Sequence, residues 1–203
     1  MKRNEWLKNN AYDFHTKINP SLSNTTKKNI DYFISGISDE GFILVVHDYE
    51  RFSEMLSMNG RSSVIEMNIN RYIGKNVKDK QEPKLHFIHM FDGIIAFLVF
   101  DNLFPEDINI FLRKAYTALK CDGRGMLICS ISELETARAH QRNLHKQGIP
   151  AILGEIIENG VYQFKPPLNV IESIIKRSGF VIEDCTFENT YTAFITIQKG
   201  LFD

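Results

Sequence analysis

The segment FILVVHDYERF, residues 42–52, decides the fold. It begins with an unbroken run of apolar, β-prone residues, which is typical of a parallel strand covered on both faces. Polar residues follow at once, and apolar residues then recur at helical spacing at Phe52, Met55 and Leu56. This order predicts a buried strand, a tight turn and a helix, the opening unit of an α/β nucleotide-binding domain.

The turn in this segment departs from what such a domain needs. A turn that holds a nucleotide normally carries glycines, because without a Cβ the backbone N–H groups can approach the ligand. This turn carries His47, Asp48, Tyr49 and Glu50 instead. The sequence therefore predicts a nucleotide-binding fold whose cofactor loop is bulky and negatively charged.

Composition sets wider limits. The chain has 203 residues, 43% of them apolar, which suits one domain with a full hydrophobic core. The formal net charge of −1 provides no overall field that would attract nucleic acid or an anionic membrane, so we expect neither as a partner. We find no signal peptide and no apolar run near the roughly 18 residues of a membrane span, and expect a cytoplasmic protein. The three cysteines form no CxxC pair, and we expect no metal site.

Strand and helix patterns alternate along the rest of the chain. Strands are expected at residues 63–67, 93–100 and 126–129, and helices at 105–119, 133–147 and 166–178. Two final strands, 180–186 and 192–197, are too close for a crossover helix and should pair as an antiparallel hairpin. The predicted fold class is α/β, with a mostly parallel sheet, helices on both faces and this hairpin at the end.

We treat residues 1–203 as a single domain with two additions. Residues 1–38 are expected to form a helical lid, with one helix over 5–18 and a second capped by Thr25 or Thr26. Residues 148–165 are an irregular insertion, with a short apolar helix expected around 152–157.

Three later motifs connect this order to a known family. FDGII at residues 91–95, LRKAYTALKCDG at 112–123 and SGF at 178–180 are similar to family motifs before strands four, five and six. With the order of elements, they make the chain, from roughly residue 6 to 199, resemble the class I S-adenosylmethionine-dependent methyltransferases. The resemblance implies a Rossmann-like sheet of seven strands, or of six, because residues 68–92 are shorter than the corresponding family segment.

The resemblance also implies where a cofactor would be held. It places Leu44 at the family's acidic position on the first strand, and Val46, Asp48 and Glu50 at its three glycines. The position of the ribose-binding acid falls on Asn68, with Glu66 as a substitute two residues earlier. Residues after the fourth strand face the substrate in the family. The candidate cofactor-binding residues are thus His47, Asp48, Tyr49, Glu50, Glu66, Asn68, Asp101 and Asn102, and no catalytic residue is assigned.

Two functions stay open at the level of sequence, and with them the question of whether the chain is an enzyme. In the first, it is a methyltransferase-like protein with a degenerate S-adenosylmethionine site, a non-catalytic or regulatory subunit that partners an active methyltransferase or pairs as a homodimer. In the alternative, it is an active small-molecule methyltransferase with an atypical cofactor site. We favour the first and expect weak or absent cofactor binding by the isolated chain, because acidic side chains at glycine positions would repel the methionyl carboxylate.

Overall fold

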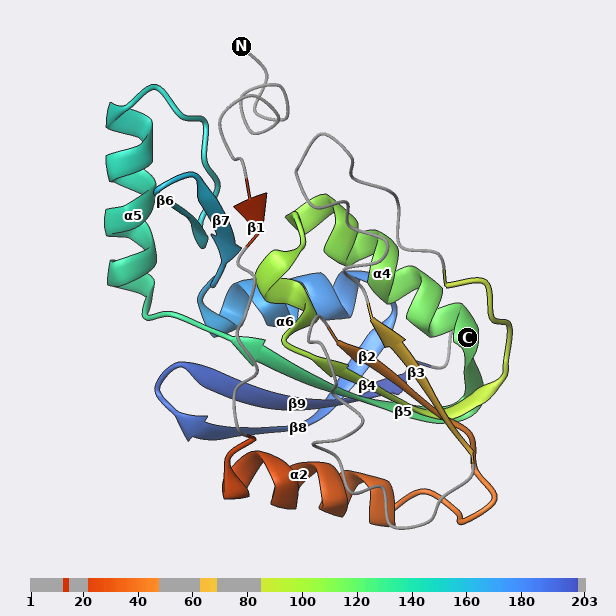
Figure 1. Cartoon of the computed structure of the whole chain (residues 1–203). Helices are drawn as coiled ribbons and strands as arrows, with labels where there is room; N and C mark the ends of the chain where they lie inside the picture. The colour runs from red at the N-terminus through yellow and green to blue at the C-terminus, as the bar shows by residue number, and fades with distance from the viewer. Residues whose placement is uncertain (1–12, 15–21, 48–62, 69–84, 201–203) are drawn as a thin grey trace.

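The computed structural model describes residues 13–14, 22–47, 63–68 and 85–200. Its centre is a six-stranded sheet in the order β3-β2-β4-β5-β9-β8 (Figure 1). The strands are β2 (Ile43–His47), β3 (Val64–Asn68), β4 (Phe91–Phe97), β5 (Leu119–Ser130), β8 (Phe180–Asn189) and β9 (Thr192–Lys199).

The pairing of these strands confirms the predicted fold class. Strands β3, β2, β4 and β5 are mutually parallel, and β9 runs antiparallel to both of its neighbours, β5 and β8. The strand order changes direction at β2, because the chain goes first to β3 on one side and later to β4 on the other. The sheet has six strands in the part of the chain that the structure describes.

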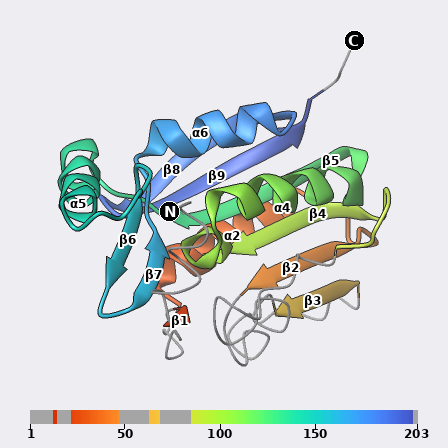
Figure 2. The ribbon, with the colours of Figure 1, turned by 90° about the horizontal axis from the view of Figure 1, so that it is seen from above.

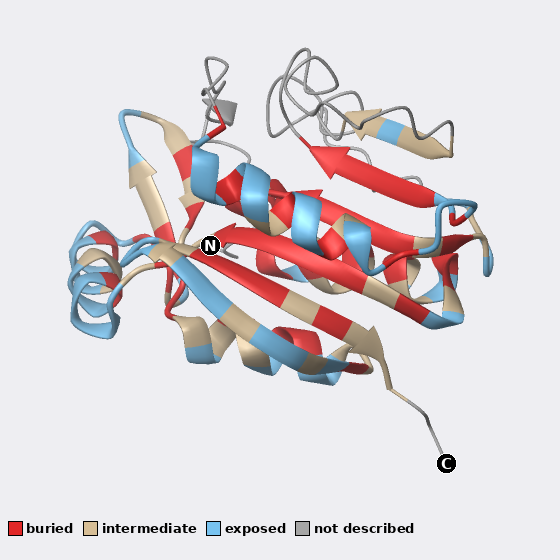
Figure 3. Cartoon of the chain, turned by 90° about the horizontal axis from the view of Figure 1, so that it is seen from below, coloured by how far each residue is buried: buried red, intermediate tan, exposed pale blue. Residues whose placement is uncertain are grey.

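Helices cover both faces of the sheet, as expected. Helices α4 (Pro105–Ala118) and α6 (Leu168–Arg177) lie on one face, and α2 (Asn24–Ser35) lies on the other (Figure 1). One apolar cluster joins α4 and α6 to the sheet through residues such as Phe111 and Ile175. A second joins α2 through Ile30 and Phe33 to Ile43, Val45 and Ile95. In Figure 3 the central strands are buried, while β8 at the rim is largely exposed.

A second, three-stranded sheet stands at one end of the molecule. It consists of β1 (Asp13–Phe14), β7 (Val161–Phe164) and β6 (Glu155–Glu158), in the order β1-β7-β6. Figure 2 shows this sheet beside α5 (Leu134–Lys146), beyond the carboxyl ends of the parallel strands. It joins the N-terminal segment to the insertion, two regions that are far apart in the sequence.

Two expectations for these peripheral regions were wrong. The short helix around 152–157 is instead strand β6, which pairs with β7 across Asn159 and Gly160. Both of these residues have positive φ, 52° and 79°, as a two-residue hairpin turn requires, and Asn-Gly is the typical sequence for it. The helix expected over 5–18 cannot be continuous, because Asp13–Phe14 pairs with β7 as a strand. The rest of that range lies outside the described residues.

Several boundaries also moved. The cap of α2 is Ser23, whose hydroxyl accepts a hydrogen bond from the Thr26 N–H, rather than Thr25 or Thr26. The helix packs on a face of the sheet, and a lid role for residues 1–38 stays a prediction. Strand β4 ends at Phe97, followed by a 3-10 helix, η3 (Val99–Asn102). Strand β5 follows α4 directly, and residues 122–123, which end the LRKAYTALKCDG motif, lie at the shift in its register with β4.

None of the helices in the described part of the chain is long and apolar enough to cross a membrane.

The aspartate of the FDGII motif, Asp92, has a structural role at the edge of the sheet where the parallel strands begin. The carboxylate of Asp92 accepts hydrogen bonds from the backbone N–H of Phe42, at 2.8 Å, and from Lys120 Nζ, at 2.8 and 2.9 Å. It thereby ties the start of β4 to the residue before β2 and to the start of β5. Burial alone would raise the pKa of Asp92, but the hydrogen bonds and positive charge of Lys120 and the Phe42 N–H bring it below its ordinary value.

We predict that Asp92→Asn changes how the free energy of unfolding depends on pH. A carboxyl with a lowered folded-state pKa stabilises the fold above its unfolded-state pKa, and this contribution is lost as the pH falls through the folded-state value. Because Asp92 and Lys120 are partly exposed, we expect the variant to lose about 1 kcal/mol or less at pH 7. The difference should shrink as the pH falls below the ordinary carboxyl pKa of about 4.

Urea unfolding between pH 3 and pH 7 measures this effect. Asp184→Asn, on the exposed edge strand β8, controls for the loss of one negative charge. A deficit in Asp92→Asn that is the same at every pH would show that the carboxylate charge does not carry the contribution.

Candidate functional site

The carboxyl ends of β3, β2, β4 and β5 meet at one edge of the sheet, which we call the switch edge. In open parallel sheets, ligands bind outside the carboxyl ends of the strands, where the strand order changes direction. Here that point is the end of β2. Its last residue, His47, lies level with Asn68 of β3 and Phe97 of β4. The structure therefore brings the predicted residues His47 and Asn68 side by side at the expected place.

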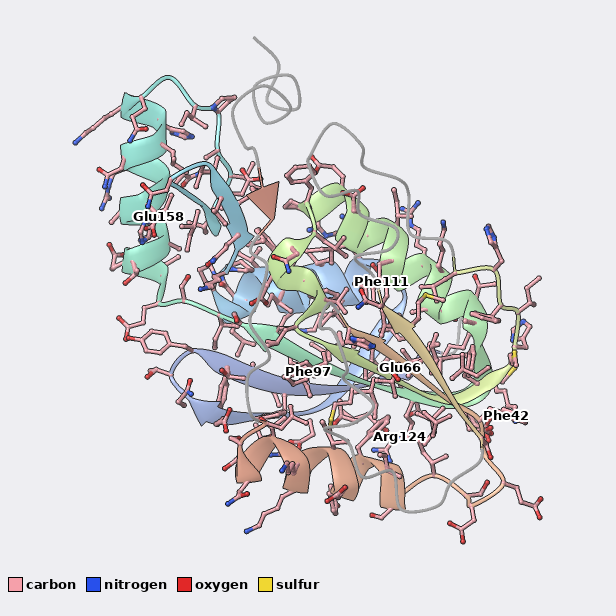
Figure 4. All side chains as sticks on the ribbon, viewed as in Figure 1. Phe42, Glu66, Phe97, Phe111, Arg124 and Glu158 are labelled. Atoms are coloured by element: carbon pink, nitrogen blue, oxygen red, sulfur yellow. The ribbon has the colours of Figure 1, made fainter. Side chains whose placement is uncertain are left out.

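His47 is turned inward and contacts a second predicted residue. Its side chain is only 3% exposed, and its Nε2 lies 2.7 Å from Oε1 of Glu66, whose side chain is 31% exposed. The two side chains come from the adjacent parallel strands β2 and β3, and Figure 4 labels Glu66 on β3. This contact is an ion pair when the ring carries a proton. The carboxylate that could serve as the ribose acid is thus engaged by a side chain of the same chain.

The segment after β4 also turns its polar groups inward. Leu98 adopts a left-handed conformation with φ of 52°, which begins the tight 3-10 turn of η3. Asp101 and Asn102, both predicted cofactor-binding residues, are 2% and 1% exposed. The Asp101 carboxylate accepts hydrogen bonds from Ser130 Oγ, at 2.6 Å, and from the Ser130 N–H, at 3.2 Å. Asp101 therefore fastens η3 to the end of β5.

Of the remaining predicted residues, the structure describes one and leaves three outside its described ranges. Asn68 is half-buried at the end of β3. Asp48, Tyr49 and Glu50 lie outside the described residues, so their role as the filled cofactor loop stays a prediction.

The small sheet packs against the switch edge through residues that the sequence analysis did not single out. Tyr162 of β7 makes an edge-to-face contact with Phe104, just after η3, with ring centroids 4.6 Å apart. The Tyr162 hydroxyl donates to Oε1 of Glu155, at 3.1 Å, and the Ile152 N–H donates to Oε2 of the same carboxylate, at 2.8 Å. Glu155 and Tyr162 are fully buried. Only the Asn-Gly turn after β6 could have revealed this hairpin from the sequence.

Metal and thiol chemistry have little support at this edge. Among the residues that the structure describes, no three His, Cys, Asp or Glu side chains are grouped as a metal site would require. Burial, with smaller effects from Asp101 and Cys185, raises the pKa of the Cys129 thiol well above its ordinary value. Cys129 is therefore a protonated, unreactive core side chain.

Comparisons with known proteins agree with this architecture. No sequence-family model and no curated protein matches the chain. Among solved structures, a SAM-dependent methyltransferase from Methanosarcina mazei superposes with a TM-score of 0.58 at 12% identity, covering 84% of this chain and 98% of that chain. The 1,6-didemethyltoxoflavin-N1-methyltransferase of Burkholderia thailandensis, with bound 1,6-didemethyltoxoflavin and S-adenosylhomocysteine, superposes at 0.54 and 12% identity, covering 86% and 76%.

A SAM-dependent methyltransferase from Mesorhizobium loti gives 0.51 at 11% identity, covering 83% of this chain and 96% of that chain. The chain therefore has the Rossmann-like fold of the S-adenosylmethionine-dependent methyltransferases, which confirms the resemblance at the level of the fold.

We predict that Asp101→Ala destabilises the protein by about 1–3 kcal/mol, because it leaves the Ser130 N–H and hydroxyl without their acceptor. Asp122→Ala, at an exposed carboxylate of β5, should change the free energy of unfolding by less than about 0.5 kcal/mol. Urea unfolding of both variants, and of Ser130→Ala with the double variant Asp101→Ala/Ser130→Ala, measures the coupling. Strict additivity of Asp101→Ala and Ser130→Ala would contradict a direct contact.

Proposed function

We propose that the chain is a methyltransferase-like subunit whose S-adenosylmethionine site is degenerate, and that it partners an active methyltransferase instead of methylating alone. The observation that carries the proposal is the contact between His47 and Glu66 at the switch edge. A nucleoside that needs a carboxylate for its ribose hydroxyls would have to displace a buried imidazole at 2.7 Å. This displacement would break the contact of a buried polar ring with a carboxylate, which costs free energy.

The amino acids at the cofactor loop support the same proposal. At the family's glycine positions the sequence has Val46, Asp48 and Glu50. Two carboxylates near the methionyl carboxylate of the cofactor would repel it by a few kcal/mol in a partly buried site. A micromolar affinity corresponds to only about 8 kcal/mol, so a loss of this size would remove much of the binding.

The polar groups of η3 give a third line of support. In a working ligand site, some polar side chains face the cavity and wait for a partner. Here Asp101 is buried and already accepts two hydrogen bonds from Ser130. The Asp101 carboxylate therefore holds η3 against the end of β5.

One observation favours the alternative, an active methyltransferase with an atypical site. The sheet β1-β7-β6 stands beyond the carboxyl ends of the parallel strands, where a cover for a small substrate would be placed. The contact between Tyr162 and Phe104 packs this sheet against the segment after η3, so the sheet is part of the folded domain. An active methyltransferase would need such a cover over its substrate. A non-catalytic subunit that descends from an active enzyme could have kept the same sheet.

We expect calorimetric titration of the purified chain with S-adenosylmethionine to show no saturable binding at concentrations up to about 1 mM. A catalytically active methyltransferase of the same fold, titrated in the same buffer, controls for the quality of the cofactor. Binding with a micromolar Kd would defeat the proposal and favour the alternative. Methyl transfer that requires both this chain and a second methyltransferase would support it.

Glycine restoration in the loop tests whether the loop is the sole obstacle. We expect Asp48→Gly/Glu50→Gly to remain without saturable binding below about 1 mM, because His47 still engages Glu66 and because Asn68 is not an acid. Calorimetry measures affinity, and urea unfolding confirms that the variant is folded. A micromolar Kd for this variant would show that the loop alone blocks the site and that the His47–Glu66 contact does not.

A further inference from the structure

A groove lies on the far side of the molecule from the switch edge. Its volume is about 400 Å³, and it runs between residues 85–88, which precede β4, and the C-terminal half of α4. Arg113, Lys114 and Thr117 form the helical wall. Because residues 85–88 lead into the amino end of β4, this α4 groove lies toward the amino-terminal edge of the sheet.

The walls of the α4 groove are held in place by main-chain and aromatic contacts. The N–H groups of His89 and Met90 donate to the carbonyls of Thr117 and Ala118, at 2.9 and 2.8 Å, and so fasten the segment to the end of α4. The Phe87 ring packs edge-to-face on Phe91, with centroids 5.0 Å apart. A groove with fixed walls binds without a large loss of conformational entropy, which favours recognition.

One apolar side chain of the groove, Ile88, is exposed to solvent although the backbone around it is held in place. Ile88 is 72% exposed, although the segment on both sides of it is anchored, at Leu85 by burial and at His89 by its backbone bond. Ile88 adds little to the core, because most of its surface is exposed, whereas the other apolar residues of the segment are buried or half-buried. An exposed aliphatic side chain on a rigid wall is the kind of anchor that protein interfaces use.

The charge of the α4 groove defines what it complements. Its lining includes Arg113, Lys114 and His86, and none of the described residues that line it is acidic. The whole chain has a formal net charge of −1, so this cluster of bases is a local feature. Its complement is a segment with carboxylates that flank an apolar side chain, which would pack on Ile88 and Phe87.

The openness of the groove distinguishes a protein segment from a small ligand. Small-molecule sites enclose 70–90% of the ligand surface, which needs a deep cavity. Here His86, Ile88, Arg113 and Thr117 are all exposed. The shallow shape therefore suits an extended or helical segment of another protein.

We propose that the α4 groove docks an acidic segment of a partner protein around one apolar anchor. The choice of a protein as the occupant rests on the proposed role of the chain as a partner subunit. The groove leaves the switch edge uncovered, so docking there would leave the small sheet and η3 free.

The test uses a synthetic ten-residue peptide of Glu and Asp with a central Leu-Phe pair, titrated into the full-length chain at 150 mM salt. Two matched peptides accompany it, one with Ser-Ser in place of Leu-Phe and one with Lys in place of each acid. Binding is followed by calorimetry and by backbone amide NMR shifts. We expect saturable 1:1 binding of the acidic Leu-Phe peptide alone, with shifts confined to residues 85–90 and the C-terminal half of α4.

Variants assign this binding to the groove. Arg113→Glu and Ile88→Asp should each weaken it by about tenfold or more, because each removes one half of the complementarity. Two control variants make the same kinds of substitution outside the groove. They are Arg142→Glu, on the exposed face of α5, and Val181→Asp, at a 56% exposed position of β8. Each should alter the Kd by less than about twofold. Far-UV circular dichroism and thermal unfolding check that all four variants are folded.

Three outcomes would overturn the proposal. The first is equal binding of the Ser-Ser peptide, which would mean simple charge attraction. The second is binding that Arg113→Glu leaves unchanged. The third is no peptide binding while octanoate shifts the same amides, which would make the groove a site for a small anionic amphiphile. None of these depends on S-adenosylmethionine, so failure here and failure of the proposed function are separable by the cofactor titration.

Discussion

The burial of strand β2 between β3 and β4 is the constraint on which the rest of the structure depends. All five residues of β2 are buried, and their hydrogen bonds fix the register of both neighbours. The same strand packs on α2 through Ile43 and Val45 and on the opposite core through Leu44 and Val46. Because β2 is where the strand order reverses, this packing also decides which side chains meet at the edge where ligands bind in such sheets.

At that edge, two of the described polar side chains, His47 and Asp101, contact other residues of the chain. Buried polar atoms need partners, and a binding site obtains them from its ligand when the protein leaves them available. Here His47 contacts Glu66, and Asp101 accepts hydrogen bonds from Ser130. These contacts stabilise the fold at the place where the methyltransferase fold would otherwise be expected to hold its cofactor. The proposal of a non-catalytic subunit rests on these internal contacts.

The two edges of the sheet have different characters. The switch edge carries internal side-chain contacts, and the sheet β1-β7-β6 stands beyond it, with Tyr162 packed on Phe104. The amino-terminal edge carries the Asp92 network and, beside α4, a rigid basic groove with Ile88 exposed. Under the proposed function, the contacts at the switch edge would stabilise the fold, and the groove at the amino-terminal edge would be the accessible surface for a partner.

The sequence by itself determined the α/β class, the parallel sheet and the terminal hairpin. Apolar runs such as residues 43–46, the Pro105 helix start and Gly179, with φ of 91°, act over a few neighbouring residues, so they can be interpreted locally. The sequence also placed His47 and Asn68 at the switch edge, since both end parallel strands.

Only the tertiary structure decided what those residues contact. The distance between His47 and Glu66 depends on the register of β2 with β3, and the partner of Asp101 depends on where β5 ends. The pairing of Asp13–Phe14 with β7 joins segments that no local pattern connects, and it overrode the helical periodicity of the N-terminal segment. Contacts between residues distant in sequence are fixed by the packing of the whole domain, which is why the pattern of one segment could not reveal them.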